Sequence, residues 1–179
     1  MTTHEAREPA RQTAETRRSS GEARGLDRKV LADMVLEAVR HIGAEELNPP
    51  VTTETSPAFQ PRAMLAMLTY CYASGVYGSE DVEQMMYEDT AFRALCGMDY
   101  PDHLRLRRFR RYNHGPIQKT LEETLRGTWS SSDHAGLDGG TAKSESSNGL
   151  LDAANQDRIA REARSRIEKA MFIDQMTTD

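Results

Sequence analysis

Apolar residues recur at three- and four-residue intervals along most of the chain, which is the spacing of one face of an α-helix. The first such stretch, residues 26–47, predicts an amphipathic helix of about five turns that ends near Gly43. The next helix is predicted to begin at Pro61, because a residue without an N–H fits the first turn, and to end at Gly75. Residues 48–60 between them contain three prolines and predict an extended connector.

Polar capping residues divide the following part of the chain into shorter helices. Ser79 and Asp89 are each placed to cap a helix, because a short polar side chain accepts hydrogen bonds from the free N–H groups of a first turn. Asp102 precedes a basic helix in the same way, and Pro116 starts a separate helix that runs to Arg126. The predicted fold class is mainly α, a compact helical bundle. The positions that the pattern places inside are Leu31, Met34, Val35, Ala38, Val39, Ile42, Met64, Leu65, Leu68, Cys71, Tyr72, Val82, Met85, Met86, Phe92, Leu95, Cys96, Ile117, Leu121 and Leu125.

Positive charge gathers on residues 105–111, where five of the seven residues are arginine. On a helix, one side carries Leu106, Phe109 and Asn113, and the other carries the four arginines from 107 to 111. This predicts a docked helix with a cationic outer face, centred on Arg107 and Arg111, while the stem of Arg110 borders the apolar side. A guanidinium suits phosphate oxygens and base edges, and the plain alternative is a solvated surface helix that binds nothing. The candidate DNA-binding residues are Arg105, Arg107, Arg108, Arg110, Arg111 and His103.

Other chemistry-bearing residues fit structural roles. His103 beside Asp102 fits capping or contact with a phosphate better than acid–base catalysis, because adjacent residues at a helix start do not face a common substrate. Tyr70 and Tyr77 are expected to be partly exposed, whereas Trp129 is expected to pack against the bundle.

Composition restricts the class of protein. The net charge of −5 argues against a globally basic nucleic-acid coat, but residues 79–89 are acidic while 105–111 are basic, which would confine a DNA contact to one face. Cys71 and Cys96, the two cysteines, lie in apolar helical patterns and are predicted to be core residues rather than a disulfide. No spacing fits a metal site and no segment approaches the ~20 apolar residues of a membrane span, so a cytoplasmic protein without membrane contact is expected.

The two ends of the chain lack the broad apolar stripes of the middle. Residues 1–25 mix arginine with glutamate and predict a disordered arm. Residues 127–149 are rich in serine and glycine and predict a flexible linker, followed by a charged amphipathic helix at 150–176. Residues 26–126 are therefore expected to fold without either tail. The last helix has a narrow apolar seam that is a candidate for pairing with a second chain, formed by Ile159, Ala163, Ile167, Ala170 and Met171.

Four short motifs follow one another between Gln60 and Arg111. Their residues are Pro61, Arg62, Leu65, Leu68, Tyr70, Tyr72 and Gly75, then Ser79, Val82 and Glu83, then Asp89, Phe92, Arg93, Leu95 and Gly97, and finally Pro101, Asp102, His103, Leu106, Phe109, Arg110 and Arg111. In this order and spacing the segment resembles the N-terminal, InsH-type DNA-binding domain of bacterial insertion-sequence transposases, which precedes a DDE catalytic core. The chain departs from that pattern at Arg105 and Arg107, which add charge, and at Glu80, where the family often has a basic residue.

The resemblance implies a helix-turn-helix-like module that recognises transposon-end DNA, with duplex DNA as its partner. It also matches Asp138, in a degraded D-G-T-K-like motif at 137–143, to the first of three metal-binding carboxylates. Asp138 is a weak candidate only, because a two-metal site needs several converging carboxylates and the sequence ends before the others. No catalytic residue and no cofactor is assigned, since Mg²⁺ would be required only by a complete DDE core. The chain is expected to be a truncated or frameshifted transposase that retains the DNA-binding end.

Two other functions stay open. One is a partial DDE transposase that a second reading frame completes in trans by supplying the missing carboxylates. The other is a protein-interaction regulator, such as a transposition inhibitor, that forms a homodimer or dimerises with full-length transposase. The isolated chain is expected to have no catalytic activity alone.

Overall fold

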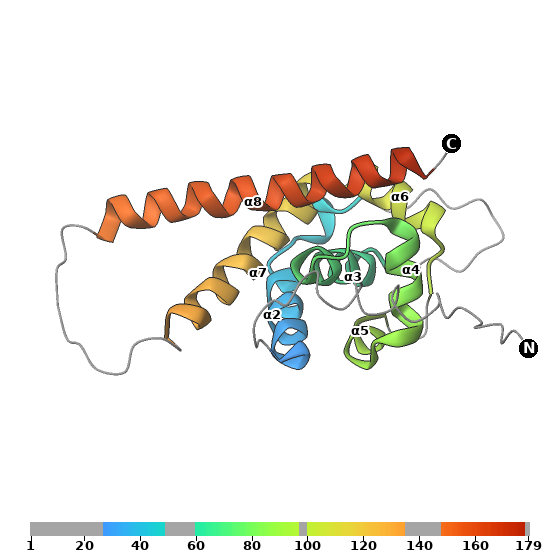
Figure 1. Cartoon of the computed structure of the whole chain (residues 1–179), viewed down its shortest axis with the longest axis horizontal. Helices are drawn as coiled ribbons and strands as arrows, with labels where there is room; N and C mark the ends of the chain where they lie inside the picture. Colours follow the sequence, from blue (N-terminus) through green and yellow to red (C-terminus); the bar gives the residue numbers. More distant parts are fainter. Residues whose placement is uncertain (1–26, 49–59, 97–99, 135–147, 178–179) are drawn as a thin grey trace, which may run out of the picture.

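The computed structural model describes residues 27–48, 60–96, 100–134 and 148–177, which form a bundle of seven α-helices and one short 3₁₀ helix and contain no strand (Figure 1). The prediction of a mainly α fold is confirmed. The arm predicted at 1–25 lies outside the described residues. The elements are α2 (Arg28–Arg40), η1 (Ala44–Glu46), α3 (Pro61–Ser74), α4 (Ser79–Glu88), α5 (Thr90–Cys96), α6 (His103–Tyr112), α7 (His114–His134) and α8 (Asn148–Met176).

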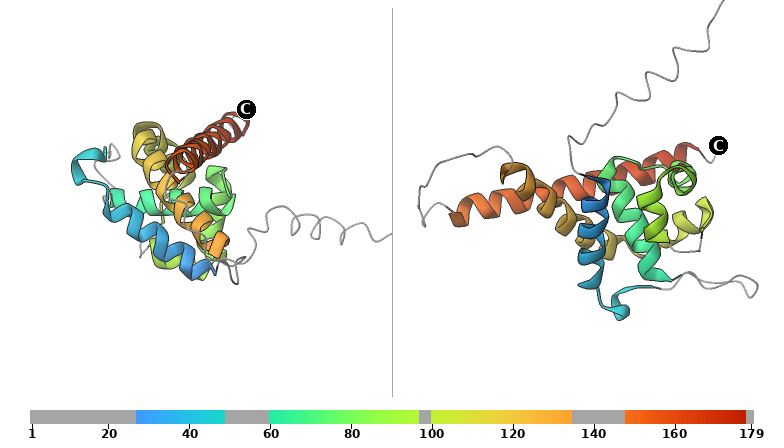
Figure 2. Two further views of the ribbon diagram at one scale, coloured as in Figure 1. Left: turned by 90° about the vertical axis from the view of Figure 1, so that its left-hand side faces the viewer. Right: turned by 90° about the horizontal axis from the view of Figure 1, so that it is seen from below.

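Helix α3 forms the centre of the bundle. Residues 64–72 are all buried, because α2, α5 and α7 pack around this helix (Figure 1, Figure 2). Tyr70 is therefore buried, and the prediction that it is partly exposed is wrong. Its ring stacks on Phe92 with the centroids 5.6 Å apart, and its hydroxyl donates to Asp89 Oδ2 at 3.3 Å. Tyr77 is partly exposed, as predicted.

Several predicted helix ends are confirmed. Gly75 ends α3 with a φ of 87°, the left-handed conformation that favours glycine. Asp89 caps α5, since its Oδ1 accepts from two N–H groups of the first turn at 2.8 and 3.1 Å. Helix α2 is shorter than predicted and ends at Arg40, because the next two N–H groups bond three residues back rather than four. Gly43 therefore lies beyond the helix.

Helix α7 is longer than predicted at both ends. Pro116 lies in its first turn, and its last part includes residues 127–134, which the sequence assigned to a flexible linker. In this Ser/Thr-rich part, the hydroxyls of Thr128 and Ser130 donate to backbone carbonyls of α7 itself at 2.9 and 3.0 Å. Because these hydroxyls donate to carbonyls of the same helix, they do not draw the backbone into a non-helical conformation. The predicted inner residues Ile117, Leu121 and Leu125 are buried.

Helix α8 lies along one side of the bundle and runs from the far end of α7 towards α4 and α6 (Figure 1). Four residues of its apolar seam are buried in the core of this chain, so the hypothesis that they pair with a second chain is wrong. Trp129 of α7 packs against the same core, as predicted, and the Arg158 guanidinium lies 4.4 Å from the centre of its ring. The four buried seam residues are Ile159, Ala163, Ile167 and Ala170.

Two smaller expectations concern the cysteines and the membrane. Cys71 is fully buried in the core, as predicted, while the side chain of Cys96 lies outside the description. Within the described residues no helix combines the length and the apolar character that a membrane span requires.

Candidate nucleic-acid interface

Two carboxylates fix the start of α6. Asp102 Oδ1 accepts a hydrogen bond from the N–H of Arg105 at 2.8 Å, which confirms the predicted cap. Glu83 of α4 reaches across, and its Oε2 accepts from the N–H of His103 at 3.1 Å and lies 2.9 Å from His103 Nδ1. His103 therefore attaches α6 to α4 through Glu83, and its proposed contact with phosphate stays a prediction.

The inner side of α6 is the one that the sequence predicted. Leu106, Phe109 and Asn113 are fully buried. Asn113 joins the end of the helix to the segment after η1, because its Oδ1 accepts from the N–H of Asn48 at 2.8 Å and its Nδ2 donates to Asn48 O at 3.0 Å. The apolar contacts and this amide pair hold α6 at a fixed orientation.

Arg110 does not lie on the outer face where the sequence placed it. Its side chain is 4% exposed and forms an ion pair with Asp174 of α8. Its guanidinium also donates to the hydroxyl of Tyr72 at 2.8 Å and to Ser79 Oγ at 3.2 Å. Four turns of helix, from α3, α4, α6 and α8, thus meet around one buried charge. Arg110 follows Phe109 and lies one turn after Leu106, so a small rotation of α6 towards α4 and α8 buries it.

Asp174 is the acceptor at the centre of this cluster. It accepts from the N–H and the hydroxyl of Ser79 at 2.9 and 2.7 Å, at the beginning of α4. Ser79 is not the helix cap that the sequence predicted, because Gly78 holds that position and Ser79 is the first residue of α4, whose free N–H donates to the Asp174 carboxylate. Arg107 Nε lies 3.4 Å from the same carboxylate.

Arg107 is therefore largely covered, and the prediction that it lies at the centre of the outer face is wrong. Its side chain is 17% exposed and donates to Thr177 Oγ1 at 2.8 Å, while Glu80 Oε1 lies 3.5 Å away. The covering residues come from α4, from the last turn of α8 and from Thr177 just after it. Because α8 is far from α6 in sequence, no local pattern around Arg107 indicated this contact.

The part of α6 that remains exposed is a strip of four residues, which we name the exposed α6 face: Leu104, Arg108, Arg111 and Tyr112. Leu104 and Tyr112 are 61% and 54% exposed, so the strip also offers apolar and aromatic surface. Arg105 borders the strip, with its Nε 3.7 Å from Asp102 Oδ2. The face presents two guanidinium groups between apolar and aromatic neighbours on a helix that is held on its other sides, an arrangement suited to sugar–phosphate and base-edge contacts.

The buried phenol of Tyr72 in the Arg110 cluster should make the protein less stable at alkaline pH. Burial raises the pKa of Tyr72 to about 12, although Arg110 opposes the shift. Below pH 10 the phenol is neutral in both states, but above pH 10 it ionises in the unfolded chain first. Ionisation of Tyr72 should therefore lower the free energy of unfolding by up to about 3 kcal/mol between about pH 10 and 12. Urea melts across this range should show a flatter fall for Tyr72→Phe and an unchanged fall for the exposed Tyr87→Phe; equal slopes in both variants would contradict the burial.

Sequence reasoning missed Asp174 as a member of the site. A signal for it exists, because Asp174 follows Ile167 and Ala170 at the same seven- and four-residue spacing as the seam and so continues the inward side of α8. An acidic residue at an inward position indicates a buried cationic partner. The sequence could not indicate which of the arginines it meets.

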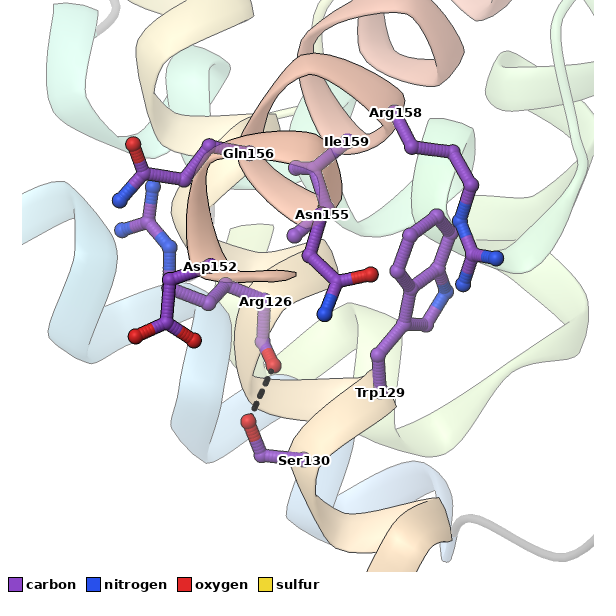
Figure 3. A pocket seen from close by; sticks show the side chains of 8 residues that line it. All are labelled: Arg126, Trp129, Ser130, Asp152, Asn155, Gln156, Arg158 and Ile159. Carbon is purple, nitrogen blue, oxygen red and sulfur yellow. Dashed lines mark hydrogen bonds between the residues drawn. The ribbon is translucent and has the colours of Figure 1, made fainter. Parts of the chain in front are cut away.

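A pocket lies between α7 and α8, at the opposite end of α7 from α6. This pocket of about 540 Å³ is formed by Arg126, Trp129, Ser130, Asp152, Asn155, Gln156, Arg158 and Ile159 (Figure 3). Arg158 covers the face of Trp129, and the Ser130 hydroxyl donates to the backbone carbonyl of Arg126 (Figure 3). Ser130 and Arg158 are thus engaged with the chain itself, and the polar side chains of the pocket do not converge on one point as the groups of a catalytic site do (Figure 3).

Metal chemistry has no centre in the part of the chain that the structure describes. Across residues 27–48, 60–96, 100–134 and 148–177, no three side chains among histidine, cysteine, aspartate and glutamate lie close enough together to hold an ion. Asp138, the weak candidate for a first carboxylate, lies outside the described residues.

Comparison with known proteins identifies one relationship. Residues 25–112, from just before α2 to the end of α6, match the family described as transposase domain (DUF772). No curated protein and no solved structure gives a match. The match supports assigning this part of the chain to a transposase-related family and suggests a role in transposition, and it leaves α7 and α8 outside the matched region.

Proposed function

We propose that this transposase-related chain binds duplex DNA at transposon ends, and that the exposed α6 face makes the contact. The observation that carries the proposal is that Arg108 and Arg111 are exposed one turn apart on a helix whose start, inner side and end are all fixed. A rigid helix keeps the position of each guanidinium defined, which phosphate and base contacts require.

The charges around α6 support a DNA contact that is limited to a few of its basic residues. Glu80 and Glu83 of the acidic helix α4 lie against Arg107 and His103, so those two basic residues are balanced within the chain. The guanidinium groups of Arg108 and Arg111 stay at the surface. Because the side chains of Arg108 and Arg111 are exposed, we assign phosphate or base contact to these two residues first, with Arg105 at the edge, and we assign the buried Arg110 a structural role.

Binding of labelled duplex DNA at several salt concentrations tests the proposal. The double variant Arg108→Ala, Arg111→Ala should bind all duplexes more weakly, and its log–log salt slope should be smaller by about 2, because each phosphate contact contributes about 0.9. The matched control is Arg161→Ala, Arg164→Ala, which removes two exposed arginines from α8 and gives the same net charge.

The result separates phosphate contacts from base contacts. If one arginine reads a guanine, its single alanine variant should lose about 1–3 kcal/mol at one base pair and keep its affinity for other sequences. Equal affinities and equal slopes for the two double variants would show that α6 is a solvated surface helix. Completion of a DDE enzyme in trans and inhibition by dimerisation stay predictions from the sequence.

A further inference from the structure

The Asp174 carboxylate lies in a complete set of anion-binding groups. It accepts from the N–H and hydroxyl of Ser79 at the beginning of α4, forms an ion pair with Arg110, and has Arg107 Nε at 3.4 Å. Two guanidinium groups, a hydroxyl and a backbone N–H at the positive end of a helix dipole all face one acidic group. Glu80 Oε1 also lies 3.5 Å from the Arg107 guanidinium, so two carboxylates balance the two guanidinium groups, while the donors of Ser79 and Arg110 converge on Asp174.

These donors have the chemistry of a phosphate site. A phosphodiester needs backbone N–H groups at a helix start and forked donors that meet two oxygens at once, and both are present here. A carboxylate carries one negative charge and two oxygens on one carbon, so it fits the same donors as two oxygens of a phosphodiester. Arg110 is 4% exposed and is aimed into this site rather than into solvent.

The segment that supplies Asp174 is attached more weakly than the rest of α8. The buried apolar residues of α8 end at Ala170, and beyond it Met171, Phe172 and Met176 are exposed. The last turns are held by Asp174, by the hydrogen bond from Arg107 to Thr177 Oγ1 at 2.8 Å, and by the half-buried Ile173 beside Gly78. A helix end with few buried apolar contacts opens locally at a lower cost in free energy than the packed seam before it.

The site is continuous with the exposed α6 face. Arg107 lies one turn before Arg111 on the same helix, so a DNA strand that crosses Arg111 passes the place where the last turns of α8 now lie. We propose that Asp174 occupies a phosphate-binding site formed by Ser79, Arg107 and Arg110, and that a backbone phosphate of DNA replaces it when the end of α8 is released. This inference rests on the proposed function for its ligand, because it takes the phosphate to come from bound DNA.

Inorganic phosphate tests the site without DNA. In Asp174→Ala the acceptor is missing, so 10 mM phosphate should raise the midpoint of thermal unfolding by roughly 3–5 °C relative to chloride at equal ionic strength. The wild-type chain, in which Asp174 fills the site, should gain much less. The double variant Ser79→Ala, Asp174→Ala should lose most of the gain. Equal shifts in wild type and Asp174→Ala would overturn the proposal.

A reversible lock tests the same site in a chain that keeps Asp174. A Cβ atom built on Gly78 lies 3.2 Å from Ile173 Cγ2, so Gly78→Cys and Ile173→Cys place two thiols within reach of a disulfide. In a Cys96→Ser background, oxidation should lower the affinity for duplex DNA by roughly tenfold and reduce the salt slope by about 1–2, because the Asp174 site can no longer open. Addition of a thiol reductant should restore both values.

The outcomes of the lock experiment are separable. Equal binding by the oxidised and reduced forms would show that Asp174 is a permanent structural partner of Arg110, and would leave the exposed α6 face as the proposed DNA contact. Absence of DNA binding in both forms would contradict the proposed function and the DNA phosphate as ligand. The thermal shift with inorganic phosphate decides in either case whether the anion site exists.

Discussion

Replacing Arg110 with alanine should lower the free energy of unfolding by about 3 kcal/mol. The change removes a buried charge that joins four helices, and it leaves the hydroxyl of Tyr72 without its donor. The loss of stability should lie near the lower end of the range for broken buried ion pairs. Asp174 keeps Ser79 as a partner and lies near the end of α8. Urea unfolding followed by circular dichroism measures it.

Arg108→Ala is the matched control for that experiment. Arg108 is exposed and lies half a turn away from Arg110 on the same helix, so its loss should change stability by no more than about 0.5 kcal/mol. Arg110→Lys should recover only part of the loss, because an ammonium group cannot reach Tyr72, Ser79 and Asp174 at once with a planar fork. If Arg110→Ala were as stable as Arg108→Ala, the buried position of Arg110 in solution would be wrong.

Deleting residues 148–179 should cost about 5 kcal/mol of stability. The deletion removes two fully packed isoleucines and two alanines from the core and uncovers the surface of α7 on which they lie. A buried isoleucine contributes about 1.5–3 kcal/mol, and a domain of this size has about 5–15 kcal/mol in total. The sequence-based expectation that 26–126 folds without its tails therefore changes to a marginally stable fragment.

A thermal melt of residues 26–134 against the full chain tests the contribution of α8. The fragment should unfold at a much lower temperature, and with a broader transition if its packing becomes loose. A second fragment that ends at residue 171 retains the buried seam and lacks Asp174, so it should recover only the part of the stability that the seam contributes. If both fragments melt like the full chain, α8 does not pack on the bundle in solution.

The family match and the structure divide the chain at different places. The matched residues end with α6, so Tyr72, Ser79 and Arg110 lie inside the matched region, while their acidic partner comes from α8 outside it. The bundle is therefore completed by a segment beyond the transposase-related domain. This segment controls how much of the positive charge of α6 reaches the surface.

Residues close together in the sequence were enough to predict several helix ends and the inner side of α6. Gly75, Asp89 and Asp102 were placed correctly, because a left-handed residue or a cap acts within one turn of its own position. The inner side of α6, with Leu106 and Phe109, followed from the 3.6-residue repeat. These features depend only on neighbours along the chain.

The tertiary structure decided what happens to the arginines. Helical periodicity places Arg107 and Arg110 off the apolar stripe, and it contains no information about a carboxylate that meets Ser79 from 95 residues away. The same holds for Tyr70, which is buried because other helices surround α3 on every side. Burial of a charge depends on whether an opposite charge is brought to it, and long-range packing alone determines that. The sequence therefore determined a basic helix, and the fold determined that Arg108 and Arg111 form its exposed part.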